Sequence, residues 1–205
     1  MNKIVVLKNV GMSFSGEPIF YDVNMEITAG KIIALMGANG CGKSTLLRII
    51  AGVLPNTDGE VIHSTDIKMA YIPDRFPKLP FKVKDYLHHM GEIQGVATKA
   101  IDEYINRMFK TLNIPIGIKN RNINNCSKGT VQKINIMQAL ITKPDLLLLD
   151  EPFSGLDEAS LTEFIALLKN LAQDGTTIIL SCHERAHAVE LTEDVFVFEG
   201  GALKC

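Results

Sequence analysis

The sequence predicts a single α/β domain with a largely parallel sheet, an antiparallel β part near the N-terminus and a small helical insert. Short segments rich in Val and Ile fill most of the first 75 residues. A stretch with helical periodicity and few strand signals follows, and strand and helix alternate again after about residue 127. Such alternation implies right-handed crossovers, which place ligands at the carboxyl ends of the strands.

The N-terminal part is expected to be mostly strands, each bounded by Gly, Pro or Asn. These expected strands span residues 3–7, 23–27, 31–36, 60–62 and 69–72. One helix interrupts them at about residues 43–51, and Gly52 follows it as a stop signal.

The expected helical insert begins after prolines that break regular structure. Apolar residues then recur at steps of four, three and four, at Ile101, Ile105, Met108 and Leu112. This spacing forms one stripe along a helix, so the segment from about residue 77 to residue 125 is predicted to be helical.

The C-terminal part returns to alternating helices and strands. A helix is expected with one apolar face made of Val131, Ile134, Met137 and Ile141. The four leucines 146–149 after Pro144 predict a buried parallel strand. A further helix is expected from Leu161, Phe164, Leu168 and Leu171, and two strands from residues 176–180 and 195–198.

Composition excludes several classes of protein. Of the 205 residues, 46% are hydrophobic and 21% are charged, which is typical of a folded chain. The net charge of −2 gives no electrostatic signal for nucleic acid or an anionic membrane surface. No apolar run reaches the roughly 18 residues that a membrane span needs, and we expect no secretory signal. The four cysteines form no CxxC pair, so free thiols in a reducing cytosol are expected.

Residues 37–45 carry a phosphate-binding motif between an expected strand and an expected helix. Their sequence, Gly-Ala-Asn-Gly-Cys-Gly-Lys-Ser-Thr, fits G-x-x-x-x-G-K-[ST]. Glycines permit a tight loop whose N–H groups converge on phosphate oxygens, and the helix adds its positive end. The candidate binding residues are Gly37, Asn39, Gly40, Cys41, Gly42, Lys43, Ser44 and Thr45.

This motif predicts a P-loop NTPase core. Lys43 is expected to reach the β and γ phosphates, and Ser44 to place its hydroxyl on Mg²⁺. A glycine-rich turn without a ligand is the alternative interpretation.

Two carboxylates follow the run of four leucines. An acidic side chain at the end of a buried strand is costly unless it serves an ion. We therefore expect Asp150 to hold Mg²⁺ and Glu151 to orient or deprotonate an attacking water. The alternative is a strand end that turns outward to solvent.

With these motifs in this order, the chain resembles the nucleotide-binding subunit of an ABC (ATP-binding cassette) transporter over essentially its whole length. The resemblance implies that Phe14 stacks on adenine, that Asp157 lies in a loop that crosses a dimer interface, and that His183 contacts the γ phosphate. Taken singly, a strand aromatic such as Phe14 is more often packed in a core, and a lone histidine such as His183 is usually structural.

The family's signature motif corresponds to residues 125–133 and departs from its common form. Ser127 and Gly129 are kept, whereas Lys128 stands where the family usually has Gly. Ser127 is a good N-cap, and a serine with free N–H groups at a helix start forms an anion site. The resemblance implies that this helix end faces the ATP of a second subunit. Lys128 either strengthens phosphate binding or points to water.

A second departure is Asp74, where the family usually has Gln or Glu. The resemblance implies that this position reaches Mg²⁺ and the attacking water. Asp is shorter than Glu, so it is expected to act through a bridging water; if it does not reach, coupling is weak or a neighbouring residue makes the contact. The alternative is that Asp74 only forms a turn after Pro73.

The resemblance implies one ATPase domain over residues 1–205, with a core at about 1–76 and 140–205 and a helical subdomain at about 77–139. ATP and Mg²⁺ are the expected cofactors. The implied function is ATP hydrolysis that powers a membrane transporter through nucleotide-driven dimerisation with composite sites. The partners are a separate transmembrane permease and a second nucleotide-binding subunit, identical or different, with no direct nucleic acid.

The expected location is cytoplasmic, peripheral on the inner face of the cell membrane and attached only through the permease. Because the segment after His183 is short, we expect no C-terminal regulatory domain of the kind that some import ATPases carry, which favours an exporter or a small housekeeping system. A soluble ATPase of the same family that remodels a nucleic-acid or ribosomal partner is the alternative function. A small-molecule kinase or a GTPase would not need Ser127, Asp157 and His183 in this order.

Overall fold

The computed structural model describes residues 2–204, and the chain forms two compact units. The first unit comprises Met1–Asp74, Pro144–Pro152 and Ala166–Cys205. The second unit comprises Arg75–Lys143 and Phe153–Ile165.

The first unit contains two sheets, which confirms the predicted fold class. The six-stranded sheet has the order β5 (Met69–Ile72), β6 (Leu146–Leu149), β7 (Thr177–Ser181), β3 (Ile32–Met36), β8 (Val195–Glu199), β9 (Ala202–Lys204). It is parallel except for the β8–β9 pair. The antiparallel sheet has the order β2 (Glu17–Thr28), β1 (Lys3–Phe14), β4 (Asp58–His63).

Strands β1 and β2 are longer than the sequence predicted. Each has 12 residues, whereas segments 3–7 and 23–27 were expected. The pairing register between them shifts several times, and Asn9 and Asp22 have left-handed backbones with φ of 51°. With these irregularities, β1 and β2 stay paired along polar stretches whose sequence lacks the alternation typical of a strand.

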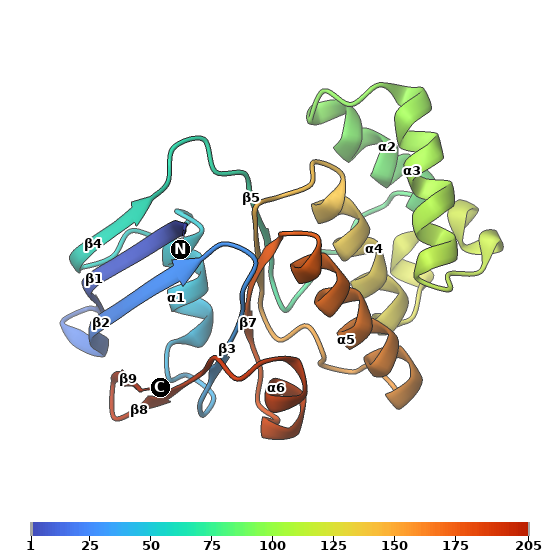
Figure 1. The fold of residues 1–205 in the computed structure, drawn as a ribbon. Coiled ribbons are helices and arrows are strands. Elements are labelled where there is room, and N and C mark those ends of the chain that lie inside the picture. The colour runs from blue at the N-terminus through green and yellow to red at the C-terminus, as the bar shows by residue number, and fades with distance from the viewer. Residues whose placement is uncertain (1, 205) are drawn as a thin grey trace. The chain divides into compact units, whose positions relative to one another are not determined.

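The core of the first unit lies around helix α1 (Lys43–Ile50), which Figure 1 shows between the antiparallel sheet and β3. Buried side chains from both sheets and from α1 form one cluster, which includes Val5, Ile27, Leu47, Leu148 and Ile179. Strands β3, β6 and β7 are buried along their whole length, which explains why they are apolar except for the two end residues of β7, Thr177 and Ser181. Helix α6 (Arg185–Leu191) contacts β3.

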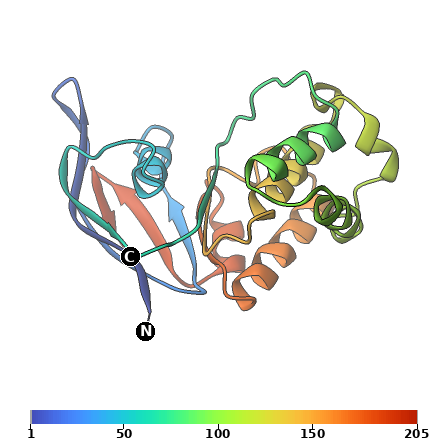
Figure 2. The ribbon, with the colours of Figure 1, turned by 90° about the horizontal axis from the view of Figure 1, so that it is seen from above.

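The second unit is helical. It contains α2 (Val83–Ile93), α3 (Thr98–Thr111), α4 (Lys128–Leu140), the first half of α5 (Glu158–Gln173) and the short 3₁₀ helices η1 (Ile116–Asn120) and η2 (Ile123–Asn125), seen in green, yellow and orange in Figure 2. The predicted apolar stripe on α3 is buried. The Tyr104 hydroxyl ties α3 to α4 by donating to the Met137 carbonyl at 2.6 Å.

Within the part of the chain that the structure describes, no helix is long and apolar enough to span a membrane.

Candidate functional site

The sheet register brings three parts of the sequence to one edge of the first unit. Strand β6 pairs with β7 so that Leu149 lies opposite Leu180, and Asp150 therefore follows level with Ser181. Strand β3 pairs with β7 so that Leu35 lies opposite Ser181. The phosphate loop, the two carboxylates and the segment leading to His183 thus leave the sheet at the same carboxyl edge.

The phosphate loop turns into α1 through glycine. Gly42 is the N-cap of α1 and has φ of 112°, a backbone that only glycine adopts easily. Lys43 is 5% exposed, and its Nζ donates to the carbonyls of Gly37 at 2.8 Å and Ala38 at 3.2 Å. The same Nζ lies 3.7 Å from Oε1 of Glu151. The amine is therefore held inside the loop, facing the carboxylate.

Asp150 is a buried carboxylate, 2% exposed, held by hydroxyl groups. Its Oδ1 accepts from Oγ of Ser44 at 2.8 Å and from Oγ of Ser181 at 2.7 Å. Its Oδ2 accepts from the Tyr71 hydroxyl at 3.4 Å. The Ser44 hydroxyl and the Asp150 carboxylate are paired hard oxygen ligands, which suit Mg²⁺.

Glu151 has an unusual backbone, and a lysine and a histidine lie beside its side chain. Its φ is 50°, and its N–H donates to Oγ of Ser181 at 2.8 Å. Its Oε1 lies 2.8 Å from Nε2 of His183. Partial burial raises the pKa of Glu151, and the charges of His183 and Lys43 oppose that rise. A carboxyl with a raised pKa beside a histidine is suited to accept a proton.

An open cavity of about 240 Å³ collects most of the predicted site residues of the first unit. It is lined by Asn39, Gly40, Gly42, Lys43, Ser44, Thr45, Asp74, Glu151 and His183. Asp150 lies behind Ser44, and Cys41 packs against the apolar core. Phe14 is outside the lining and is 48% exposed, so it is not the buried core aromatic of the alternative interpretation.

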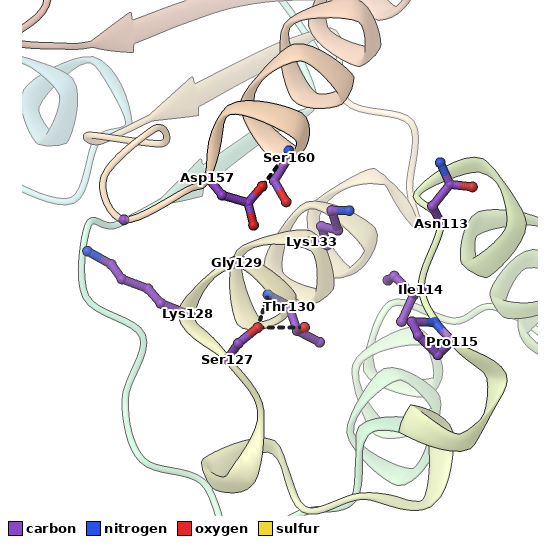
Figure 3. Close-up of a pocket in the computed structure, with 11 residues that line it drawn as sticks. Asn113, Ile114, Pro115, Ser127, Lys128, Gly129, Thr130, Lys133, Asp157 and Ser160 are labelled. Atoms are coloured by element: carbon purple, nitrogen blue, oxygen red, sulfur yellow. Dashed lines mark hydrogen bonds between the residues drawn. The ribbon is translucent and has the colours of Figure 1, made fainter.

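A second cavity, of about 160 Å³, lies within the second unit around the start of α4 (Figure 3). Ser127 is the N-cap of α4 and accepts from the N–H of Thr130 at 3.2 Å. Gly129 is the second residue of the helix and also lines the cavity. The start of a 13-residue helix, capped by serine and open to a cavity, favours an anion.

Lys128 is exposed, lines the second cavity and contacts the loop that leads into α5. Its Nζ donates to Oγ of Ser154 at 2.8 Å. A Cβ atom on Gly155, whose φ is 75°, would lie 2.7 Å from Cδ of Lys128. The lysine therefore lies along the loop that leads into α5 and binds it.

Asp157 forms the local start of α5. Its Oδ1 accepts from the N–H of Ser160 at 2.8 Å, and this bond keeps the pKa of Asp157 below its usual range. Asp157 lines the second cavity together with Ser127 and Gly129 (Figure 3).

Two residues that contact Asp150 were not predicted from the sequence. Ser181 and Tyr71 both hydrogen-bond Asp150. Ser181 carries a usable signal, since it is a hydroxyl that follows three apolar residues and ends the strand at the predicted ligand edge. Tyr71 carries none, because a tyrosine in a strand is ordinary.

Comparisons with known proteins agree with this geometry. A family model described as "ABC transporter" matches residues 20–154. The zinc import ATP-binding protein ZnuC of Ruegeria sp. (strain TM1040) is 31% identical, covering 99% of this chain and 80% of that protein. The spermidine/putrescine import ATP-binding protein PotA of Clostridium novyi (strain NT) is 32% identical, covering 98% of this chain and 61% of that protein.

Solved structures share the fold. A metal-chelate type ABC transporter in an inward-facing conformation is 27% identical with a TM-score of 0.86, covering 99% of this chain and 82% of that one. A dimeric ATP-binding cassette in a post-hydrolysis state, bound to ADP and phosphate, has a TM-score of 0.88 at 24% identity, covering 98% and 97%.

Gly42→Ala is expected to weaken nucleotide binding more than Gly40→Ala. Both positions have left-handed backbones, which cost an L-residue about 1–2 kcal/mol, roughly a tenfold effect. Only at Gly42 would the new Cβ also approach Phe20, to 2.7 Å from its Cδ1. Titration of each variant with Mg²⁺-ATP by calorimetry measures the difference. Equal losses would contradict the role of the Phe20 contact.

Glu151→Gln is expected to raise the free energy of unfolding at neutral pH. The folded pKa of Glu151 is raised, so the protonated form favours folding below the unfolded value of about 4.3, and this contribution is lost as pH rises through the folded pKa. The gain from Gln should therefore appear above about pH 4 and level off beyond the folded pKa.

Urea unfolding of both proteins over this pH range measures the gain. Glu199→Gln is the matched control, because Lys204 lowers the pKa of exposed Glu199 and the effect should have the opposite sign. A gain from Glu151→Gln that is constant with pH would rule out the explanation.

Proposed function

This chain belongs to the ABC transporter family and is one of its ATPase cassettes, and we propose that it powers transport by a separate membrane-spanning permease. The observation that carries the proposal is the convergence of Lys43, the Ser44–Asp150 pair, Glu151 and His183 around one cavity.

In this proposal the phosphates of ATP lie over the loop at residues 37–45. Lys43 exchanges its bonds to two loop carbonyls for phosphate oxygens, which its position inside the loop allows without a large movement. Phe14, exposed at the end of β1, stacks on adenine.

Ser44, Asp150 and Asp74 hold Mg²⁺, which neutralises charge on the phosphates when it is bound. Among residues 2–204 no group of three or more His, Cys, Asp or Glu side chains forms a metal site. Mg²⁺ nonetheless fits this chain, because it is commonly held by one or two carboxylates together with substrate phosphates and water.

Glu151 orients the attacking water and takes its proton. Burial raises the pKa of this carboxyl, which brings it toward the range of an efficient base. His183 lies 2.8 Å from Glu151 and fixes the direction of its carboxylate. His183 also lines the first cavity, in which this proposal places the γ phosphate.

The second cavity provides the other half of a composite site. Ser127, Gly129 and Asp157 line it, and in this proposal the start of α4 binds the γ phosphate held by a second cassette. Two cassettes, identical or different, therefore dimerise around ATP, and hydrolysis releases them. The bond of Lys128 to Ser154 supports the proposal by bringing the signature segment and the loop before α5 together.

Glu151→Gln is expected to keep ATP binding and to lose hydrolysis by roughly 100-fold or more, because an amide cannot accept the proton. The ATP-bound dimer should then accumulate, which size-exclusion chromatography with Mg²⁺-ATP measures. Lys43→Ala should instead lose nucleotide binding. A Glu151→Gln protein that hydrolyses ATP at the wild-type rate would refute the role of Glu151.

The partner is expected to be a permease that anchors this chain to the inner face of the cell membrane from the cytoplasmic side, without direct contact with nucleic acid. A tagged pull-down from detergent-solubilised native membranes, read by mass spectrometry, should recover a multi-span membrane protein. Recovery of soluble ribosomal or nucleic-acid-binding proteins alone would favour the remodelling ATPase instead, which none of the named relatives supports.

The direction of transport is decided in vesicles reconstituted with that partner. Export is the prediction from the sequence, whereas two relatives are named for import, of zinc and of spermidine/putrescine. ATP-driven movement away from the cassette's side of the membrane means export.

A further inference from the structure

We propose that Ser181 is a positioning residue that sets the geometry of Asp150 and Glu151 together. The inference rests on the proposed function, in which these two carboxylates hold the metal ion and accept the proton. Ser181 itself does not line the cavity and acts through its neighbours.

The register of the sheet places Ser181 where it reaches both residues. It ends β7 level with Asp150, which follows the adjacent strand β6. Its side chain is completely buried. The hydroxyl donates to Oδ1 of Asp150 at 2.7 Å and accepts from the N–H of Glu151 at 2.8 Å. One atom therefore joins the side chain of the first carboxylate to the backbone of the second.

This bridge determines where the Glu151 carboxyl points. The backbone of Glu151 is left-handed, a conformation that a residue with a Cβ keeps only when its surroundings hold it. The Ser181 hydroxyl is the partner of its N–H. With that bond in place, the carboxyl meets His183 at 2.8 Å and faces the cavity.

The bridge also connects the carboxylates to the segment that carries the histidine. Ser181 and His183 are separated only by Cys182, whose N–H donates to the Leu35 carbonyl at 3.0 Å. Strand β3, which contains Leu35, leads into the phosphate loop. A single hydroxyl thus fixes the proton acceptor relative to both the histidine and the loop.

Ser181→Ala tests the proposal in the full chain. The change leaves the N–H of Glu151 without its acceptor and removes one donor from Asp150. We expect kcat for ATP hydrolysis to fall by roughly 10- to 100-fold, as for other residues that orient metal ligands, with KM for ATP within about twofold of wild type. Ser181→Cys, which conserves volume but hydrogen-bonds weakly, should also lower kcat and serves if the alanine variant does not fold.

Thr177→Val is the matched control. Thr177 begins the same strand, is equally buried, and its hydroxyl accepts from the N–H of Gly30 at 3.0 Å, without touching either carboxylate. Loss of the Thr177 hydroxyl should lower the midpoint of thermal unfolding and leave kcat within about twofold of wild type.

The outcomes separate the inference from the function on which it rests. Wild-type kcat in the Ser181 variants, or an equal fall in kcat for the Ser181 and Thr177 variants, would overturn the positioning role. A wild-type protein that binds but never hydrolyses Mg²⁺-ATP, alone or with its permease, would overturn the proposed function itself.

Discussion

A buried carboxylate at the end of an all-leucine strand is the constraint on which the first unit depends. A charge as buried as Asp150 costs several kcal/mol unless partners compensate it. The partners of its Oδ1 are hydroxyls from the start of α1 and the end of β7. These donors meet one oxygen only if β6, β7 and β3 are adjacent and parallel in this register. The strand order is therefore tied to the chemistry.

Adjacent carboxylates acquire different properties from their surroundings. Asp150 is enclosed by hydroxyl donors and stays inside the fold, whereas Glu151 faces the cavity with Lys43 and His183 beside it. Burial raises the pKa of Glu151 despite these two neighbours. Asp150 therefore suits a metal ligand and Glu151 a proton acceptor, although the two residues are consecutive in the sequence.

The parts of the fold that the sequence predicted are those with local signals. The spacing of the phosphate loop and the run of four leucines required no knowledge of tertiary structure. The bulged ends of β1 and β2 could not be predicted, because pairing there overrides a polar pattern. The partners of Ser181 and Lys128 follow from register and loop path, which one sequence does not reveal. The ligand contacts of Phe14, Asp74 and Ser127 rest on resemblance and are still predictions.

The left-handed backbone at Glu151 has a consequence for any attempt to stabilise this protein. Glycine would relax the strain of about 1–3 kcal/mol at this position, and asparagine would relieve part of it. A screen that selects only for heat resistance is therefore expected to favour substitutions that remove the Glu151 carboxyl. On the proposed role of Glu151, thermal tolerance and turnover compete at this one residue, and we expect a library that is ranked by melting temperature alone to enrich variants that lack the proton acceptor.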